Sequence, residues 1–443
     1  MRNNCQFATA FFFAFFLPAR PALPALSARP ALPAPPALLS SQATFESVVE
    51  ELKSSDATAR LRAVRLLKDA AYPEAAIPLA ALVTDADDLV QLEAIAAELN
   101  IFLNEKIITR KRVGLVIEVR NRIAADAAFL QGPLAIGAQP VPAAVLTVLR
   151  TAAHDANPRV AVEALYAFGT LAVEPVGGRR RAMLRETGSD LAVMAGTPFL
   201  EFRYAAIRVI GRVFERRPDD GPVDPVIGDA VVTALNVNDR SIRAAAMQAL
   251  GAIRYERAIA ALTEQFRHFG RSELGDAALE ALARIAHPSS ALLFATELAG
   301  THDRFKAFAI EGLARIGDSA RRSSIETALA GERDERVLLA ASFSAVMLSD
   351  ASLDPLVEAL RKPKLALQAR QYLVEVVRGR SSALARHAQD PDVLIRVGIA
   401  DVLGLAGDPA ALPIVEGMQR DRDQQVALSA ERAVARLNAI RVS

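Results

Sequence analysis

A helical apolar pattern that recurs about every 31 residues is the feature that most constrains the fold of this chain. In residues 239–253, DRSIRAAAMQALGAI, apolar residues fall at i, i+4, i+7, i+8 and i+11, counted from Ile242. This spacing places them on one face of an α-helix. Ten further copies of this template follow or precede it. We call the residue after each first apolar position the marker; the markers are 60, 91, 161, 203, 243, 275, 306, 338, 366, 396 and 427.

The regular spacing of the markers indicates one solenoid rather than several globular domains. From 243 onward the steps are 32, 31, 32, 28, 30 and 31 residues. An Ala- and Leu-rich stretch follows each template, and it begins at a turn such as Gly407-Asp408-Pro409. Gly after one helix and Pro at the start of the next are usual helix boundaries. We therefore expect an all-α solenoid of about eleven or twelve antiparallel helix pairs over residues 42–443.

Two template positions carry residues with a structural role. Position i+4 is Ala in ten of the eleven copies, with Ala246 as one example, and a small side chain there lets a neighbouring helix approach closely. Asp precedes the marker by four residues in six copies, where its side chain can cap the helix. These residues are Asp56, Asp87, Asp239, Asp334, Asp392 and Asp423.

The pattern D-x-x-[VI]-R-x-x-A-x-x-[AV]-L-G, read at Asp239–Gly251 and Asp392–Gly404, resembles the HEAT-like repeat family. The short period is similar to the subgroup first described in phycobilisome lyases. The resemblance implies a right-handed superhelix whose second helices, those that follow each template helix, line the concave face. It also implies Asp/Arg pairs that bridge neighbouring repeats, which Asp239/Arg243, Asp392/Arg396 and Asp56/Arg60 match. At markers 275, 338, 366 and 427 the Arg is missing, so such a ladder is broken.

The first forty residues form a separate region. Residues 7–17 are apolar except for Thr9 and follow Arg2. Eleven helical residues span about 16 Å, which is too short to cross a bilayer. We therefore expect a signal peptide over residues 1–27 with an open cleavage site, and a Pro/Ala-rich linker over 28–41. The protein would then be exported to the periplasm or secreted. The alternative is a wrongly assigned start codon.

Composition and motifs argue against several classes of function. The 52 basic and 51 acidic residues give a net charge of +1, and Trp is absent, which disfavours a nucleic-acid binder. One cysteine excludes a disulfide framework. None of the five His is followed by Glu, and no catalytic or phosphate-binding motif occurs. His154, His302 and His387 lie near turns and are interpreted as turn or capping residues. We expect no catalytic residue, no metal and no cofactor.

The middle of the array is irregular. The 70-residue step between markers 91 and 161 indicates a degenerate repeat that includes the apolar residues from Val113 to Ile123. The following steps of 42 and 40 residues each add about ten residues, which we place in loops between a second helix and the next template helix. These loops supply the candidate partner-binding residues Arg179, Arg180, Arg181, Arg216, Arg217, Asp219 and Asp220. The alternatives are neutral surface decoration, or pairing of the three Arg with Asp219 and Asp220.

These observations favour an exported, monomeric, non-enzymatic repeat scaffold that binds a protein partner. It would have no stable membrane span after processing. The first alternative is a lyase-like enzyme or enzyme accessory of the HEAT-like class. The second alternative is a purely structural spacer.

Overall fold

The computed structural model describes residues 44–104, 124–172, 178–216 and 220–441. The predicted signal peptide (1–27) and linker (28–41) lie outside these residues. Thr44–Ser443 form one compact unit. Within the described ranges the chain forms helices and turns, and the β-structure is confined to an isolated antiparallel bridge between Leu103 and Ile136. The prediction of an all-α solenoid is thereby confirmed.

Each of the eleven templates forms a helix, and we call these the anchor helices. They are α2 (Ala57–Ala70), α4 (Asp88–Phe102), α7 (Pro158–Leu171), α9 (Leu200–Val213), α11 (Arg240–Ala252), α13 (Glu273–Ile285), α15 (Asp303–Ile316), α17 (Glu335–Ser349), α19 (Ala366–Val376), α20 (Val393–Ala406) and α22 (Gln424–Arg441). The others, apart from α5, are the connecting helices: α1 (Phe45–Glu51), α3 (Ala76–Ala80), α6 (Ala143–Ala152), α8 (Gly178–Ala195), α10 (Pro225–Ala234), α12 (Ile259–Phe269), α14 (Ala291–Leu298), α16 (Arg322–Ala328), α18 (Asp354–Glu358) and α21 (Leu412–Met418).

Side chains that cap the anchor helices define where these helices begin. Asp239 Oδ1 accepts a hydrogen bond from the Ile242 amide at 2.9 Å, and the other five predicted Asp residues cap their helices in the same way. His302 caps α15 by accepting from the Phe305 amide. Asp408 caps the short 3₁₀ helix η9 (Pro409–Ala411). The capping role predicted for the six Asp residues and for His302 is confirmed.

Small residues let successive anchor helices pack closely. Ala246 is fully buried in α11. A Cβ atom on Gly251 would lie 2.8 Å from the Ala281 Cα atom of α13, and a Cβ on Gly404 would lie 2.8 Å from Ala433 Cα of α22. Glycine is therefore required at these positions because the neighbouring backbone leaves no room for a side chain.

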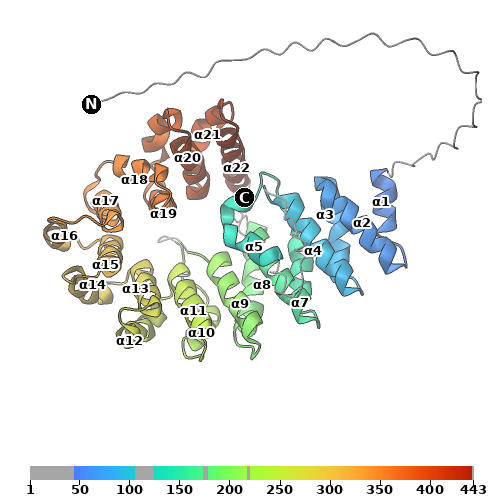
Figure 1. The fold of residues 1–443 in the computed structure, drawn as a ribbon, viewed down its shortest axis with the longest axis horizontal. Coiled ribbons are helices and arrows are strands. Elements are labelled where there is room, and N and C mark those ends of the chain that lie inside the picture. Colours follow the sequence, from blue (N-terminus) through green and yellow to red (C-terminus); the bar gives the residue numbers. More distant parts are fainter. Residues whose placement is uncertain (1–43, 105–123, 173–177, 217–219, 442–443) are drawn as a thin grey trace, which may run out of the picture. The chain divides into compact units, whose positions relative to one another are not determined.

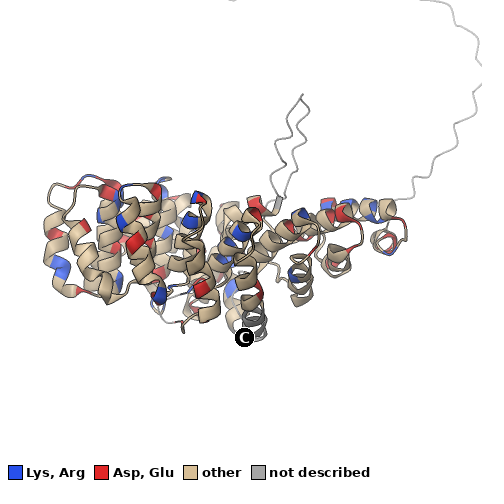
Figure 2. Cartoon of the chain, turned by 90° about the horizontal axis from the view of Figure 1, so that it is seen from below, with Lys and Arg blue, Asp and Glu red and all other residues tan. Residues whose placement is uncertain are grey.

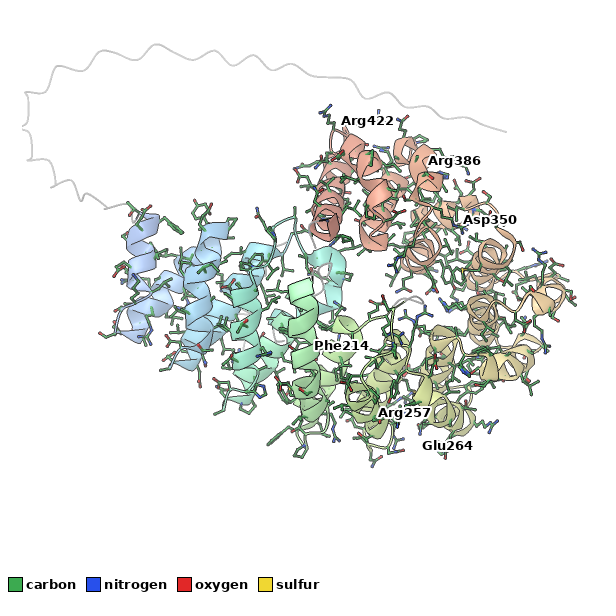
Figure 3. The ribbon with its side chains drawn as sticks, turned by 180° about the vertical axis from the view of Figure 1, so that it is seen from behind. Phe214, Arg257, Glu264, Asp350, Arg386 and Arg422 are labelled. Carbon is green, nitrogen blue, oxygen red and sulfur yellow. The ribbon has the colours of Figure 1, made fainter. Side chains whose placement is uncertain are left out.

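The connecting helices do not line the inner side of the array, which corrects the expectation that second helices face inward. Figure 1 shows α12, α14 and α16 outside α13, α15 and α17. In Figure 3, Glu264 of α12 lies on the outer side and Phe214, after α9, on the inner side. The expectation paired each anchor helix with the helix that follows it. However, α12 packs on α13 and α14 packs on α15, so the anchor helix is the second member of each pair.

A short helix occupies the place of the degenerate repeat. Helix α5 (Ala124–Gln131) packs against α4 and α7 in the position of an anchor helix. The predicted apolar residues between Val113 and Ile123 lie outside the described residues.

The two insertions follow an anchor helix rather than precede one, which is a second correction. They lie between α7 and α8 and between α9 and α10. Part of the first insertion lengthens α8 to 18 residues, so the backbone of Arg179, Arg180 and Arg181 is helical and not a loop. The run RRRAMLRE consists largely of residues that favour helices, and this preference outweighs the preceding glycines.

Candidate functional site

The structure describes only part of the predicted partner-binding set. The side chains of Arg179, Arg180 and Arg181 lie outside the described residues, as do Arg217 and Asp219. Arg216 is described: its amide donates to Ala252 O at 2.9 Å, and its Nη2 donates to the main-chain oxygen of Asp220. Asp220 is exposed. Pairing of the Arg cluster with Asp219 and Asp220 therefore stays a prediction.

Three large apolar side chains within residues 193–200, where α8 meets α9, are each exposed. Val193 is 76% exposed, Phe199 70% and Leu200 50%, and we call these three residues the Phe199 patch. Arg203 holds the turn, because its guanidinium donates to Ala195 O at 2.9 Å and to Gly196 O at 2.8 Å. Single exposed apolar side chains are common, but a cluster of large ones is typical of an interaction surface.

Sequence reasoning missed the Phe199 patch, although a signal was present. The residue that precedes the first turn of an anchor helix is usually polar and caps the helix, as Asp239 and His302 do. At α9 this residue is Phe199, which makes no capping hydrogen bond. An apolar residue at a position that favours polar ones indicates a role other than helix stability.

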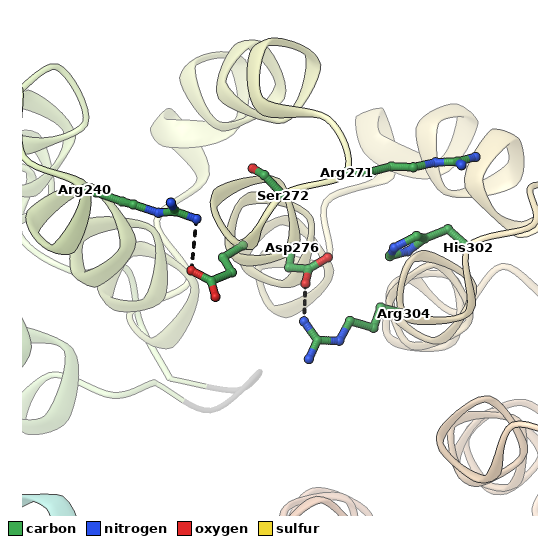
Figure 4. Close-up of a pocket in the computed structure, with 7 residues that line it drawn as sticks. Arg240, Arg271, Ser272, Asp276, His302 and Arg304 are labelled. Carbon is green, nitrogen blue, oxygen red and sulfur yellow. Dashed lines mark hydrogen bonds and ion pairs between the residues drawn. The ribbon is translucent and has the colours of Figure 1, made fainter.

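Acidic and basic residues are interspersed along the described helices, as the colouring of the cartoon in Figure 2 shows. Figure 4 shows a shallow pocket between the first turns of α11, α13 and α15. Here Arg240 pairs with Glu273 at 3.0 Å, and Arg304 pairs with Asp276. The two acidic residues that line this pocket are thus neutralised, and the pocket presents no concentrated charge of one sign.

A ladder of ion pairs joins some neighbouring repeats. The arginines are those expected, but the acids that they contact are different ones. Arg396 donates to both oxygens of Asp421, at 2.8 and 3.0 Å, and Arg60 pairs in the same way with Asp85. The acceptor lies six residues before the next marker, because the Asp at four residues before the marker already caps its helix. The hydrogen bond from Arg396 lowers the pKa of Asp421.

The expected bridge from Arg243 does not form. The residue six positions before marker 275 is Phe269 and not an acid. Arg243 instead donates to Val237 O at 2.7 Å, and its guanidinium lies 5.6 Å from the centre of the Phe269 ring. The ladder is therefore broken here by the loss of the acceptor rather than of the arginine.

A buried network of charges, which we call the inner clasp, connects anchor helices that are far apart in the sequence. Its residues are Arg254, Glu311, Arg315, Tyr372 and Glu375. Glu375 of α19 accepts from Arg254 Nη2 at 3.1 Å and from Arg315 Nε at 3.1 Å. Arg315 also pairs with Glu311 at 2.9 Å, and Tyr372 donates to Glu311.

The charges of the inner clasp compensate one another. Burial alone would raise the pKa of Glu375, but the guanidinium groups of Arg315 and Arg254 outweigh it and lower this pKa. Sequence reasoning missed the clasp because it counted only the apolar positions of the template. The charged residues recur at i+6 and i+10, as Glu311 and Arg315 show when counted from Phe305.

Two kinds of feature are absent from the residues that the structure describes. No helix there combines the length and hydropathy needed to cross a membrane. No group of three or more His, Cys, Asp or Glu side chains in these ranges is arranged to hold a metal ion.

The helix pairs stacked in series define the class of this protein as an α-solenoid. The family model for HEAT repeats matches residues 189–283, so this part of the chain is similar to HEAT repeats, and helices of the same template continue in register to α22. No comparison supports the narrower phycobilisome-lyase subgroup. Comparison with curated proteins gives no match.

Several solved structures are similar to this chain at low identity. An engineered protein is 19% identical, with 89% of this chain and 98% of that chain covered and a TM-score of 0.42. Yeast importin-β (Kap95p) is 15% identical, covers 89% of this chain and has a TM-score of 0.35; the match spans 50% of its length. A chain from work on the interaction between cadherin and β-catenin is 11% identical, with 89% and 94% covered and a TM-score of 0.39. Because all three TM-scores are below 0.5, the likeness to HEAT repeats rests on the sequence match over residues 189–283.

Proposed function

We propose that this protein is an exported HEAT-repeat scaffold that binds another protein through α8 and the turn that follows it. The Phe199 patch carries this proposal. Its three exposed apolar side chains lie on or next to a turn that Arg203 holds in place, so binding need not order the turn first. Aromatic side chains that become buried on binding contribute strongly to protein interfaces.

Helix α8 also carries three arginines at its N-terminal end, opposite the end that leads to the Phe199 patch. Arg179, Arg180 and Arg181 lie in the first turns of α8, and Val193 lies near its last turn. About 20 Å of helix separates the two groups. The partner surface that fits this arrangement places an apolar side chain against Phe199 and acidic side chains against the three Arg, which favour carboxylates.

Photo-crosslinking tests this interface in the cell. A benzoyl-phenylalanine at position 199 should give one discrete crosslinked protein. The same group at Leu292 of α14, which is 74% exposed but lies outside the patch, serves as the matched control. Equal crosslinking from both positions, or none from position 199, would contradict binding through the patch.

Export is the second part of the proposal, and the short apolar run after Arg2 supports it. Mass spectrometry of the mature protein from fractionated cells tests it. We expect a processed N-terminus in the envelope or the medium. A chain that keeps Met1 and remains in the cytosolic fraction would refute export without affecting the scaffold proposal.

A further inference from the structure

Arg254 has a backbone conformation that disfavours every residue except glycine. It follows α11 with a φ of 49°, in the left-handed region. The equivalent residues after α15 and α20, eleven positions beyond the marker, are Gly317 and Gly407, with φ of 76° and 68°. After α13 the equivalent residue is Ala286, with φ of 56°. Glycine adopts this conformation without strain, so an arginine here indicates that its side chain is needed.

The guanidinium of Arg254 donates hydrogen bonds to two parts of the array that are far apart in the sequence. Its Nε donates to the main-chain oxygen of Arg216 at 3.2 Å, and its Nη2 donates to Glu375 at 3.1 Å. Arg216 lies just after α9, whereas Glu375 lies on α19, 121 residues further along the chain than Arg254. The side chains of Arg254 and Glu375 are 15% and 14% exposed, so solvent screens their pairing only weakly.

We propose that Arg254 couples the curvature of the array to the position of the backbone at Arg216. Helices α13, α15 and α17 lie between α11 and α19 in the series, so the Arg254–Glu375 pair limits how far these two anchor helices can separate. Arg315 holds Glu375 in place through both carboxylate oxygens. A change in curvature therefore moves the guanidinium of Arg254, and with it the segment that follows α9.

This coupling has a consequence for the proposed scaffold. The segment that Arg254 holds begins directly after α9, the anchor helix whose first turn carries the Phe199 patch. The clasp would keep α9, whose first turn carries part of the patch, at one fixed position relative to α19. In this respect the inference extends the proposed function, but its test uses the isolated chain and needs no partner.

Two variants break the clasp from opposite sides. Glu375→Gln removes the charge that both arginines share, and Arg254→Gly removes the side chain while it relieves the backbone. Ala286→Gly is the matched control for Arg254→Gly, because it relieves the equivalent left-handed residue without loss of a charged side chain. Glu358→Gln, in an exposed pair with Arg361, is the control for Glu375→Gln.

Two measurements on the full chain decide the question. Small-angle scattering should show a larger radius of gyration for Arg254→Gly and Glu375→Gln and no change for either control. Hydrogen exchange at the Arg216 amide, which donates to Ala252 O, should rise by about tenfold in both clasp variants. If both variants keep the wild-type radius and exchange rate, the coupling is refuted. Should Glu375→Gln fail to fold, Arg254→Gly with its control gives the same two readings, and crosslinking at Phe199 remains a separate test of the scaffold.

Discussion

Gly251 of α11 faces the backbone of Ala281 in α13, and a Cβ atom on Gly251 would lie 2.8 Å from the Ala281 Cα atom. The same relationship recurs between Gly404 and Ala433 at the other end of the array. Two anchor helices can approach this closely only where one has no side chain.

Replacement of Gly251 by Ala should therefore destabilise the array by about 1–3 kcal/mol, because the added methyl group forces the helices apart. Chemical denaturation followed by circular dichroism measures the change. Gly417→Ala is the matched control, since nothing lies within 4 Å of a Cβ at that helical position. There the substitution should leave stability unchanged or raise it by up to about 1 kcal/mol. Equal effects at the two glycines would show that close packing is not the cause.

Ala246→Leu and Ala309→Leu should each cost about 1–3 kcal/mol through overpacking. Both alanines are fully buried on anchor helices. The midpoint of thermal unfolding should fall in each variant. If both variants unfold at the wild-type temperature, the assigned helix register is wrong.

Glu98 should make stability depend on pH in an unusual direction. It is fully buried in α4, and neither of its carboxylate oxygens has a hydrogen-bond partner within the described part of the chain. Burial raises its pKa well above the ordinary value. A raised pKa in the folded state means that the contribution of this residue is fully present below its ordinary pKa and is lost as pH rises toward the raised value.

Glu98→Leu should consequently stabilise the protein near neutral pH. Leucine occupies the equivalent template position in other anchor helices, for example Leu250 and Leu282, and a buried acceptor without a partner costs about 1–3 kcal/mol. The difference in melting temperature between variant and wild type should shrink as pH falls from neutral toward 4.5, the ordinary pKa of this carboxyl group, and then level off. A constant difference across this range would show that ionisation of Glu98 is not involved.

Replacement of Arg179, Arg180 and Arg181 by Ala should weaken partner binding with little change in melting temperature, because we expect these charges to lie in solvent, where charges add little stability. Affinity for the partner identified through position 199 and thermal unfolding are the two measurements. An Asp219/Asp220 double variant is the companion. If the Arg cluster pairs with these acids instead, both variants will show the same small shift in stability and unchanged affinity.

Much of the architecture could be predicted because it depends on local spacing. The eleven templates, the six capping Asp residues and the buried Ala246 are properties of single helices or of adjacent ones, and the repeat displays them many times. Which helix faces inward was predicted wrongly, because an alternating series of helices can be divided into pairs in two ways. Only the packing of α12 on α13 and of α14 on α15 distinguishes them.

The candidate sites were much less predictable. The inner clasp joins Arg254 to Glu375 through the curvature of the array, and no local pattern records a contact across 121 residues. The Phe199 patch could have been found, because an apolar residue replaces a helix cap. Residues such as Val113 and Arg179 were singled out because the repeat spacing is irregular there, and the described side chains do not include them.

Each connecting helix pairs with the anchor helix that follows it. This pairing also defines which segment of the gene can be duplicated without separating a helix from its partner. A duplication in the gene that begins at a connecting helix and ends after the next anchor helix would insert a whole building block with its internal contacts intact. One that begins at an anchor helix would separate that helix from its partner. The boundaries most tolerant of repeat gain and loss should therefore lie directly after anchor helices, as at Ala286 or Gly317.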